Sequence, residues 1–146
     1  MTVLDAYAVI AFLREERAAE AVESLLVAGD CVLTAVGVAE VLDHLIRVAG
    51  TTEEDASVDL AQLGLLDNVA IDAPTGAAAG RLRARSYHRT RCAVSMADCI
   101  AAEIARGRDD VVATSDPHLR EVCLREGIAF IGLPSSDGTV WSPPEN

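Results

Sequence analysis

Short apolar runs alternate with longer segments along this chain, and the two kinds of segment space their apolar residues differently. The short runs place Val, Ile or Leu in succession, which is typical of buried β-strands. In the longer segments apolar residues recur every three or four positions, as expected for amphipathic helices. The predicted strands are 2–5, 31–34, 68–72, 110–114 and 128–132. The predicted helices span about 8–16, 17–28, 36–48, 51–66, 74–87, 95–107 and 116–127.

This alternation predicts a single α/β domain. Strands that are separated by helices form a parallel sheet with helices on both faces. We therefore expect a sheet of about five strands, in an order that the sequence leaves open. The domain is expected to cover residues 1–133. Residues 134–146 are rich in Ser, Pro and Gly, which predicts a turn-rich tail.

Composition agrees with this fold class. Of the 146 residues, 51% are hydrophobic but only 3% are aromatic, so the core must be built mainly from Ala, Val, Leu and Ile. No segment approaches the roughly 18 apolar residues that span a bilayer, and the N-terminus lacks the basic region of a signal peptide. We expect a cytoplasmic protein that does not bind a membrane. The four cysteines form no CxxC pair and are expected to be reduced core thiols.

Four carboxylic residues are expected at one edge of the predicted sheet. Asp5 closes the first strand, and Asp116 closes the fourth. Glu40 lies in the first turns of the helix after the second strand, and Asp98 lies in the first turn of the sixth helix. In open α/β sheets, ligands bind at the carboxyl ends of the strands. The four acids therefore lie where a site is expected.

Acids grouped in this way point to a metal site. Four carboxylates held close together repel one another without a cation, and Mg²⁺ or Mn²⁺ prefers oxygen ligands. A divalent ion lowers the pKa of a bound water and stabilises charge on a phosphate. The chemistry that such a site suits is phosphodiester hydrolysis.

Each acid also has an ordinary structural explanation. Asp116 precedes Pro117 and has the pattern of a helix N-cap. Ser95 and Asp98 fit a capping box. Asp5 could cap the first helix. Taken singly, the capping explanation is the stronger one, but the occurrence of all four acids at one edge favours a shared site.

The sequence around these acids resembles the PIN-domain family. The resemblance rests on four blocks, in the family's order across nearly the whole chain: VLDAYAVIAFL, LTAVGVAEVLDHL, SMADCIAAEIA and VVATSDPHL. It implies a Mg²⁺- or Mn²⁺-dependent nuclease that usually acts on RNA. The implied metal ligands and catalytic residues are Asp5, Glu40, Asp98 and Asp116. Ser95 and Thr114 are implied as polar supports for these acids.

The length of the chain implies a biological setting. A lone PIN domain of this size is similar to the VapC-type toxins of bacterial type II toxin–antitoxin modules. The resemblance implies an endoribonuclease toxin whose partner is a basic or amphipathic antitoxin, and family members often form homodimers. Two positions depart from the family pattern. Tyr7 stands where many relatives have Ser or Asn, and Leu119 stands where some have a further acid.

The charge of the chain needs a separate explanation. The formal net charge is −11, and every basic residue is Arg. An acidic chain is not an obvious nucleic-acid binder, because phosphate neutralisation drives that binding. Residues 81–91, however, hold five Arg and no acid. The candidate RNA-binding residues are Arg81, Arg85, Arg89 and Arg91. The alternative is a solvated helix face followed by a mobile loop.

Two other functions are compatible with these residues. The first is a PIN-fold module that binds or regulates without turnover, although intact acids at all four positions argue against it. The second is a DNA-directed nuclease of the related flap-endonuclease type, but the chain carries no large insertion that would clamp a duplex.

Overall fold

The fold is an α/β sandwich built on one parallel sheet. A computed structural model describes residues 1–66 and 69–136. Its sheet has the strand order β2-β1-β3-β4. The strands are β1 (Thr2–Leu4), β2 (Cys31–Leu33), β3 (Val111–Thr114) and β4 (Phe130–Gly132). The prediction of an α/β fold with a helix-flanked parallel sheet is confirmed.

The helices follow the predicted periodicity closely. They are α1 (Ala6–Leu13), α2 (Ala19–Val27), α3 (Ala35–Asp43), the π-helical turn η1 (His44–Val48), α4 (Glu53–Gln62), α5 (Ala73–Ser86), α6 (Met96–Arg108) and α7 (Pro117–Glu126). Each of the seven predicted helical segments is present within the described ranges, with ends shifted by a few residues. Among the described residues, no helix has the length and apolar character needed to cross a membrane.

The prediction of a third strand at residues 68–72 is wrong for the residues that the structure describes. Residues 67 and 68 lie outside the described part of the chain, and residues 69–72 form no strand. Val69 and Ile71 are partly buried and pack against the hydrophobic cluster around α6. A short apolar run predicts burial, but it does not say whether the backbone pairs with a neighbouring strand. The expectation of about five strands was therefore one too many for the described residues.

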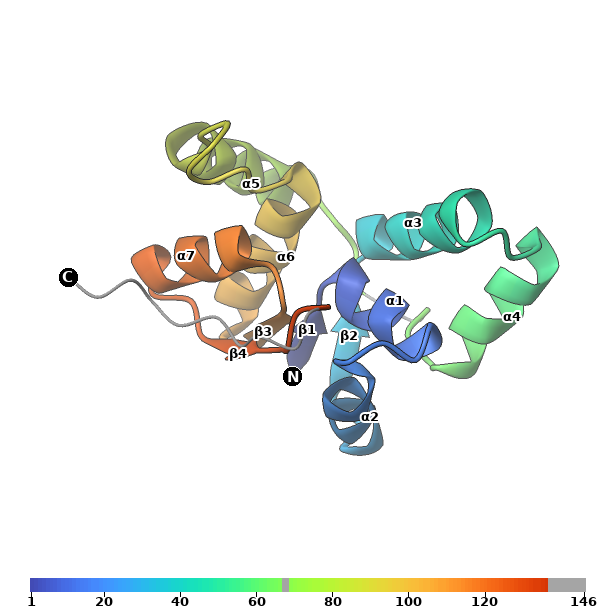
Figure 1. The fold of residues 1–146 in the computed structure, drawn as a ribbon. Helices are drawn as coiled ribbons and strands as arrows, with labels where there is room; N and C mark the ends of the chain where they lie inside the picture. The colour runs from blue at the N-terminus through green and yellow to red at the C-terminus, as the bar shows by residue number, and fades with distance from the viewer. Residues whose placement is uncertain (67–68, 137–146) are drawn as a thin grey trace.

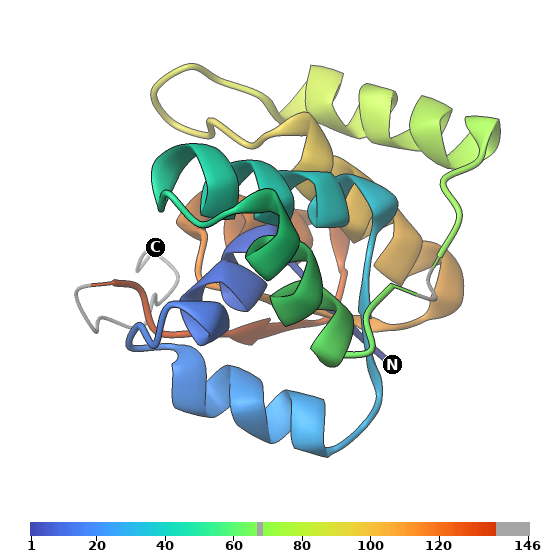
Figure 2. The same ribbon diagram turned by 90° about the vertical axis from the view of Figure 1, so that its right-hand side faces the viewer.

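The two faces of the sheet carry separate hydrophobic clusters. Side chains alternate between the faces along each strand. Val3, Val32 and Val112 point to one face, and Leu4, Leu33 and Ala113 point to the other. Helices α5, α6 and α7 cover the first face, and α1 to α4 cover the second (Figure 1; Figure 2).

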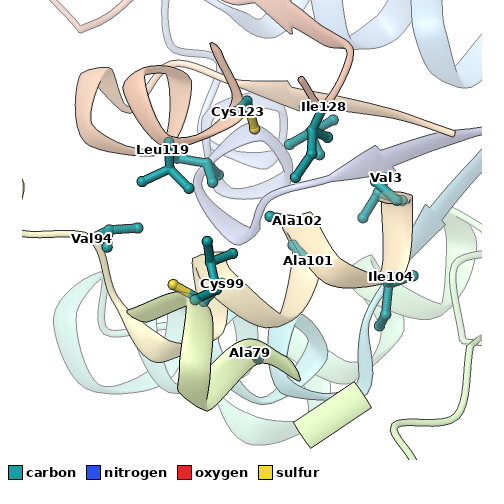
Figure 3. Packing of buried hydrophobic residues seen from close by; sticks show 14 of the residues in the cluster. Val3, Ala79, Val94, Cys99, Ala101, Ala102, Ile104, Leu119, Cys123 and Ile128 are labelled. Atoms are coloured by element: carbon teal, nitrogen blue, oxygen red, sulfur yellow. The ribbon is translucent and has the colours of Figure 1, made fainter. Parts of the chain in front are cut away.

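Small side chains and thiols fill the first cluster. Figure 3 shows Cys99 on α6 and Cys123 on α7 among its aliphatic residues. All four cysteines are free, and Cys92, Cys99 and Cys123 are buried. Burial raises the pKa of the Cys99 and Cys123 thiols to about 12, so both stay protonated and behave as small apolar groups.

The chain connections diverge between β1 and β3. From β1 the chain runs through α1 and α2 to β2, which pairs with one side of β1. The other side of β1 pairs with β3, in register Thr2 to Val111 and Leu4 to Ala113. At such a topological switch point the connections leave in opposite directions, and open α/β sheets bind ligands at the carboxyl ends of the strands there.

Candidate functional site

Asp5 lies at this switch point, directly after β1, and its side chain is buried. Its Oδ1 accepts a 2.7 Å hydrogen bond from the backbone N–H of Ala8, which caps α1. Its Oδ2 accepts a short hydrogen bond from the hydroxyl of Thr114. Thr114 is the last residue of β3 and is fully buried. Pairing of β1 with β3 therefore fixes the orientation of the Asp5 carboxyl.

Asp116 lies at the same switch point, shortly after β3, and is the N-cap of α7. Its Oδ1 accepts hydrogen bonds from the backbone N–H groups of His118 (2.7 Å) and Leu119 (3.1 Å). Its own backbone N–H donates to the Thr114 hydroxyl oxygen at 2.9 Å. One hydroxyl thus donates to Asp5 and accepts from Asp116, which links the two acids through a single buried residue.

Asp98 reaches the site from the first turn of α6. The Ser95 hydroxyl accepts from the Asp98 N–H at 3.0 Å, and the Ser95 N–H donates to Asp98 Oδ2 at 3.2 Å, which completes a capping box. Among the residues that the structure describes, Oδ1 of Asp98 and Oδ2 of Asp116 accept no hydrogen bond. Each of these carboxylates therefore keeps one oxygen available for a ligand.

Glu40 lies on α3, and its side chain is largely exposed. Gly37 allows α3 to lie close to β2, because a Cβ at this position would lie only 2.6 Å from Leu33 Cδ1. The Gly37 N–H also donates to the capping hydroxyl of Thr34 at 2.9 Å. A side chain at Gly37 would thus require either the buried Leu33 side chain or the helix that carries Glu40 to shift.

Electrostatic repulsion couples all four candidate acids. The pKa of Asp5 is raised to about 7, mainly by burial and in part by the charges of Asp98 and Asp116, while hydrogen bonds from Thr114 and Ala8 oppose the shift. Burial is also the main reason that the pKa of Asp98 is raised, with Asp116 adding to it. Loss of hydration and the charge of Asp98 raise the pKa of Glu40. The same acids therefore cap helices and also lie within electrostatic reach of one another. The capping explanation and the shared-site explanation are compatible.

The donor atoms of this cluster suit a hard divalent cation, since all are carboxylate oxygens. As they stand, no three His, Cys, Asp or Glu side chains within residues 1–66 and 69–136 are grouped so that they could hold a metal ion. Holding an ion therefore requires the carboxylates to move closer together. A cation favours that movement because it removes their mutual repulsion.

A buried arginine beneath the site was missed by the sequence analysis. Arg120 on α7 is fully buried, and its Nε and Nη2 donate to the carbonyl oxygen of Thr114 at 3.1 and 2.9 Å. Nη2 also donates to the Leu133 carbonyl. Nη1 has no hydrogen-bond partner in the described part of the chain. Burial lowers the pKa of Arg120, whereas the charges of Asp5 and Asp116 oppose this.

The only sequence signal for this role is the position of Arg120 one helical turn after Asp116. An arginine at that spacing is usually solvated, so its burial could not be read from the pattern. Leu119, where some family members carry an acid, is also fully buried and packs in the first hydrophobic cluster. The structure therefore places no fifth carboxylate at that position.

The Arg-rich segment forms the end of α5 and a hairpin turn before α6. Arg85 is already paired, with its Nη2 2.9 Å from Glu126 Oε2 on α7. Arg81, Arg89 and Arg91 are exposed and form no ion pair with any described residue. Three of the four candidate RNA-binding arginines are thus free to contact a ligand, and Arg85 is not.

The hairpin turn lies against the beginning of α7. The thiol of Cys92 donates to the His118 carbonyl at 3.9 Å, two residues after Asp116. A cleft of about 270 Å³ opens between the hairpin and α7, with Tyr87, Arg91 and Arg125 among its lining residues. This contact places the basic segment beside the acidic cluster.

Comparison with known proteins identifies the family. The family model of the PIN domain matches residues 2–124, a span that includes all four acids. The chain belongs to the PIN-domain family. The resemblance seen in the four sequence blocks is thereby confirmed. PIN domains are generally nucleases and generally use divalent metal ions.

Two solved structures share the PIN fold of this chain. A chain of FitAB bound to an IR36 DNA fragment has 20% sequence identity and a TM-score of 0.66, and the match covers 90% of this chain and 94% of that one. A chain of FitAcB from Neisseria gonorrhoeae has 22% identity and a TM-score of 0.63, with 89% and 96% covered. No curated protein sequence matches the chain significantly.

Proposed function

We propose that this PIN domain is an endoribonuclease that hydrolyses RNA phosphodiester bonds with Mg²⁺ or Mn²⁺ at the four-carboxylate cluster. The observation that carries the proposal is that Asp5, Asp98 and Asp116 lie within electrostatic reach of one another at the switch point. Burial, with a smaller contribution from the charges of Asp98 and Asp116, raises the pKa of Asp5 to about 7. A protein that only needed helix caps would not gain from placing them within electrostatic reach of one another.

The four acids would have different roles, according to their positions. Asp5 and Asp116, which Thr114 holds together, would bind the ion, and Asp98 and Glu40 would complete the site and orient the attacking water. The bound ion would supply an activated water and stabilise charge on the phosphate. Thr114 fixes the rotamer of Asp5, and Ser95 fixes that of Asp98. Such fixed geometry matters because positioning contributes a large part of the rate enhancement.

The RNA backbone would be held by the Arg-rich segment. Arg81, Arg89 and Arg91 are exposed and have charges that are not neutralised by described residues. The hairpin that carries Arg89 and Arg91 contacts the beginning of α7 through Cys92 and His118. We propose that these exposed arginines contact substrate phosphates, with Arg85 supporting the segment through Glu126. This arrangement explains how a chain of net charge −11 can bind a polyanion.

We further propose that the chain is the cytoplasmic toxin of a type II toxin–antitoxin pair. The support is its similarity to single-domain VapC-type toxins and its acidic surface, which a basic or amphipathic antitoxin segment would cover. FitAB, which shares the fold, was solved bound to DNA, and a DNA-directed nuclease is the second candidate function. We expect a homodimer only because members of the family often form one.

The test uses purified protein with total RNA and, separately, with single-stranded and duplex DNA, in Mn²⁺ and in EDTA. We expect mapped cuts in RNA only when Mn²⁺ is present. Asp5→Asn and Asp98→Asn should each lower the cleavage rate by several orders of magnitude while the protein stays folded. Near wild-type rates in either variant would contradict the assigned site. Preferential cleavage of DNA would favour the second candidate function.

A further inference from the structure

Tyr7 exposes most of its ring at the edge of the acidic cluster. It lies in the first turn of α1, two residues after Asp5, and is 61% exposed, whereas its neighbours Ala6 and Ala8 are buried. Large aromatic side chains usually bury most of their surface. An aromatic ring that is held open beside a reactive site therefore calls for a ligand that would cover it.

A groove runs past this ring along α1. It consists of two adjoining clefts of about 200 and 260 Å³, both lined by Tyr7, Ile10 and His44. The first lies between α1 and the segment α3–η1, and the second lies between α1, the turn to α2 and residues 134–136. The first cleft also includes Glu40. The second includes Ser115, which directly precedes Asp116. The groove thus borders the acidic cluster on both sides of Tyr7, and Figure 2 shows α1 between α2 and α3.

His44 supports the ring without enclosing it. The two ring centroids are 6.0 Å apart, and the planes meet at 70°, in an edge-to-face arrangement. In such an arrangement at least one face of Tyr7 is not covered by the partner. His44 Nε2 also lies 3.3 Å from Nη1 of Arg14. The three side chains therefore form one connected wall of the groove.

The second cleft is cationic. Arg14 and Arg17 both line it, and neither forms an ion pair with a described residue. Glu16 is the one carboxylate among its lining residues. In the first cleft, by contrast, Arg47 is neutralised by Asp43, with Nη2 2.7 Å from Oδ2. Free positive charge along the groove is therefore concentrated beyond Tyr7, away from Glu40.

We propose that Tyr7 is a base-stacking platform for a single-stranded nucleic acid, and that Arg14 and Arg17 bind the adjoining phosphate. The inference rests on the proposed function and identifies its substrate as unpaired at the site of cleavage. Exposed aromatic rings beside cationic side chains are the usual means of binding single strands. A duplex would not fit this use, because its bases are already stacked on one another.

Binding measured without turnover tests the platform. Tyr7→Ala and Tyr7→Phe are compared for affinity to a short single-stranded RNA, by fluorescence anisotropy in EDTA. We expect Tyr7→Ala to weaken binding about 5- to 150-fold, as a lost stacking contact does, and Tyr7→Phe to stay within about twofold of wild type. Because position 7 is exposed, thermal melts should show both variants folded.

The arginines are tested by salt dependence. The double variant Arg14→Gln, Arg17→Gln should flatten the dependence of RNA affinity on salt concentration. The matched control is Arg47→Gln, whose charge is already paired with Asp43 and which should leave the slope nearly unchanged.

The outcomes separate the platform from the proposed function. Equal RNA affinity of wild type and Tyr7→Ala, or no measurable binding by wild type, would overturn the platform even if the protein cleaves RNA. In that case the expected occupant of the groove would be a protein segment instead. Weaker binding by Tyr7→Ala in a wild type that does not cleave RNA would support the platform and contradict the proposed function.

Discussion

Two nitrogens of Arg120 donate hydrogen bonds to the carbonyl oxygen of Thr114, Nε at 3.1 Å and Nη2 at 2.9 Å. The hydroxyl of the same threonine contacts Asp5 and the backbone N–H of Asp116. A buried cation and two candidate metal-binding acids are thus attached to opposite ends of one residue. The positive charge of the Arg120 guanidinium offsets part of the negative charge of the acidic cluster.

Removing this arginine should destabilise the protein. Arg120→Met removes the side-chain donors to the buried carbonyls of Thr114 and Leu133, although Thr114 retains its hydrogen bond from the Leu133 N–H. The loss should lower the free energy of unfolding by roughly 2–5 kcal/mol. Urea unfolding in EDTA measures the effect. Arg125→Met, on the same helix but exposed, is the matched control and should change little. Equal losses in both variants would show that burial and pairing of Arg120 do not matter.

The Asp5 carboxyl predicts an unusual pH dependence of stability. Its pKa is about 7 in the folded protein against an ordinary 3.8, so the folded state binds the proton more tightly than the unfolded state does. Without metal, stability should therefore fall as pH rises from about 4 to about 7, by up to about 4 kcal/mol. The raised pKa values of Asp98 and Glu40 act in the same direction.

Melting temperatures between pH 5 and pH 7.5 in EDTA check this dependence. Glu126 acts in the opposite sense, because Arg85 and Arg106 lower its pKa to about 2, but that contribution is complete by about pH 5. Asp5→Asn, which cannot ionise, should flatten the curve above pH 5. If the wild-type and variant curves run parallel, the pKa of Asp5 is not raised.

Metal binding should stabilise the protein through Asp116. Mn²⁺ at about a hundred times its dissociation constant should add roughly 2.7 kcal/mol, a rise of roughly 5–10 °C in melting temperature. Asp116→Asn keeps an oxygen that can cap the N–H groups of His118 and Leu119 but loses the charge. This variant should melt like wild type in EDTA and lose most of the Mn²⁺ shift. A full shift in the variant would mean that Asp116 is only a cap.

The Arg-rich segment should contribute to the salt dependence of RNA binding. Replacing Arg89 and Arg91 by Gln removes two exposed, unpaired charges, which should lower the slope of log affinity against log salt by about 1.4 for a single strand. Arg85→Gln is the control, because its charge is already paired with Glu126, and it should alter the slope less. Mn²⁺ affinity should not change in any of these variants. An unchanged slope in the double variant would leave the segment as a solvated face.

Local pattern predicted most of the fold. Helices were visible because their apolar residues repeat along the chain, and β1, β2, β3 and β4 were visible as short apolar runs. Residues 69–72 have the same apolar character but form no strand, because an apolar run predicts burial and not backbone pairing. Strand order was out of reach for a related reason, since it depends on contacts between segments far apart in the sequence.

In the candidate site, too, local features were predictable from the sequence and long-range contacts were not. The positions of Asp5, Glu40, Asp98 and Asp116 at strand ends and helix starts were predictable, and so was the capping by three of them. Arg120 was not predictable, because nothing in the sequence distinguishes a buried arginine from a solvated one. The neutralisation of Arg85 by Glu126 was hidden for a similar reason, since 41 residues separate the two.

The hydrogen bond between Thr114 and Asp5 spans 109 residues, and this separation sets the order in which the site is assembled during synthesis. Asp5, Glu40 and Asp98 are synthesised before β3. Roughly 5–20 s of translation separate Asp5 from Asp116 at ordinary rates of synthesis. A nascent or truncated chain that ends before Thr114 lacks both the strand and the hydroxyl that orient Asp5. Any activity of the site therefore begins only when β3 and α7 have docked.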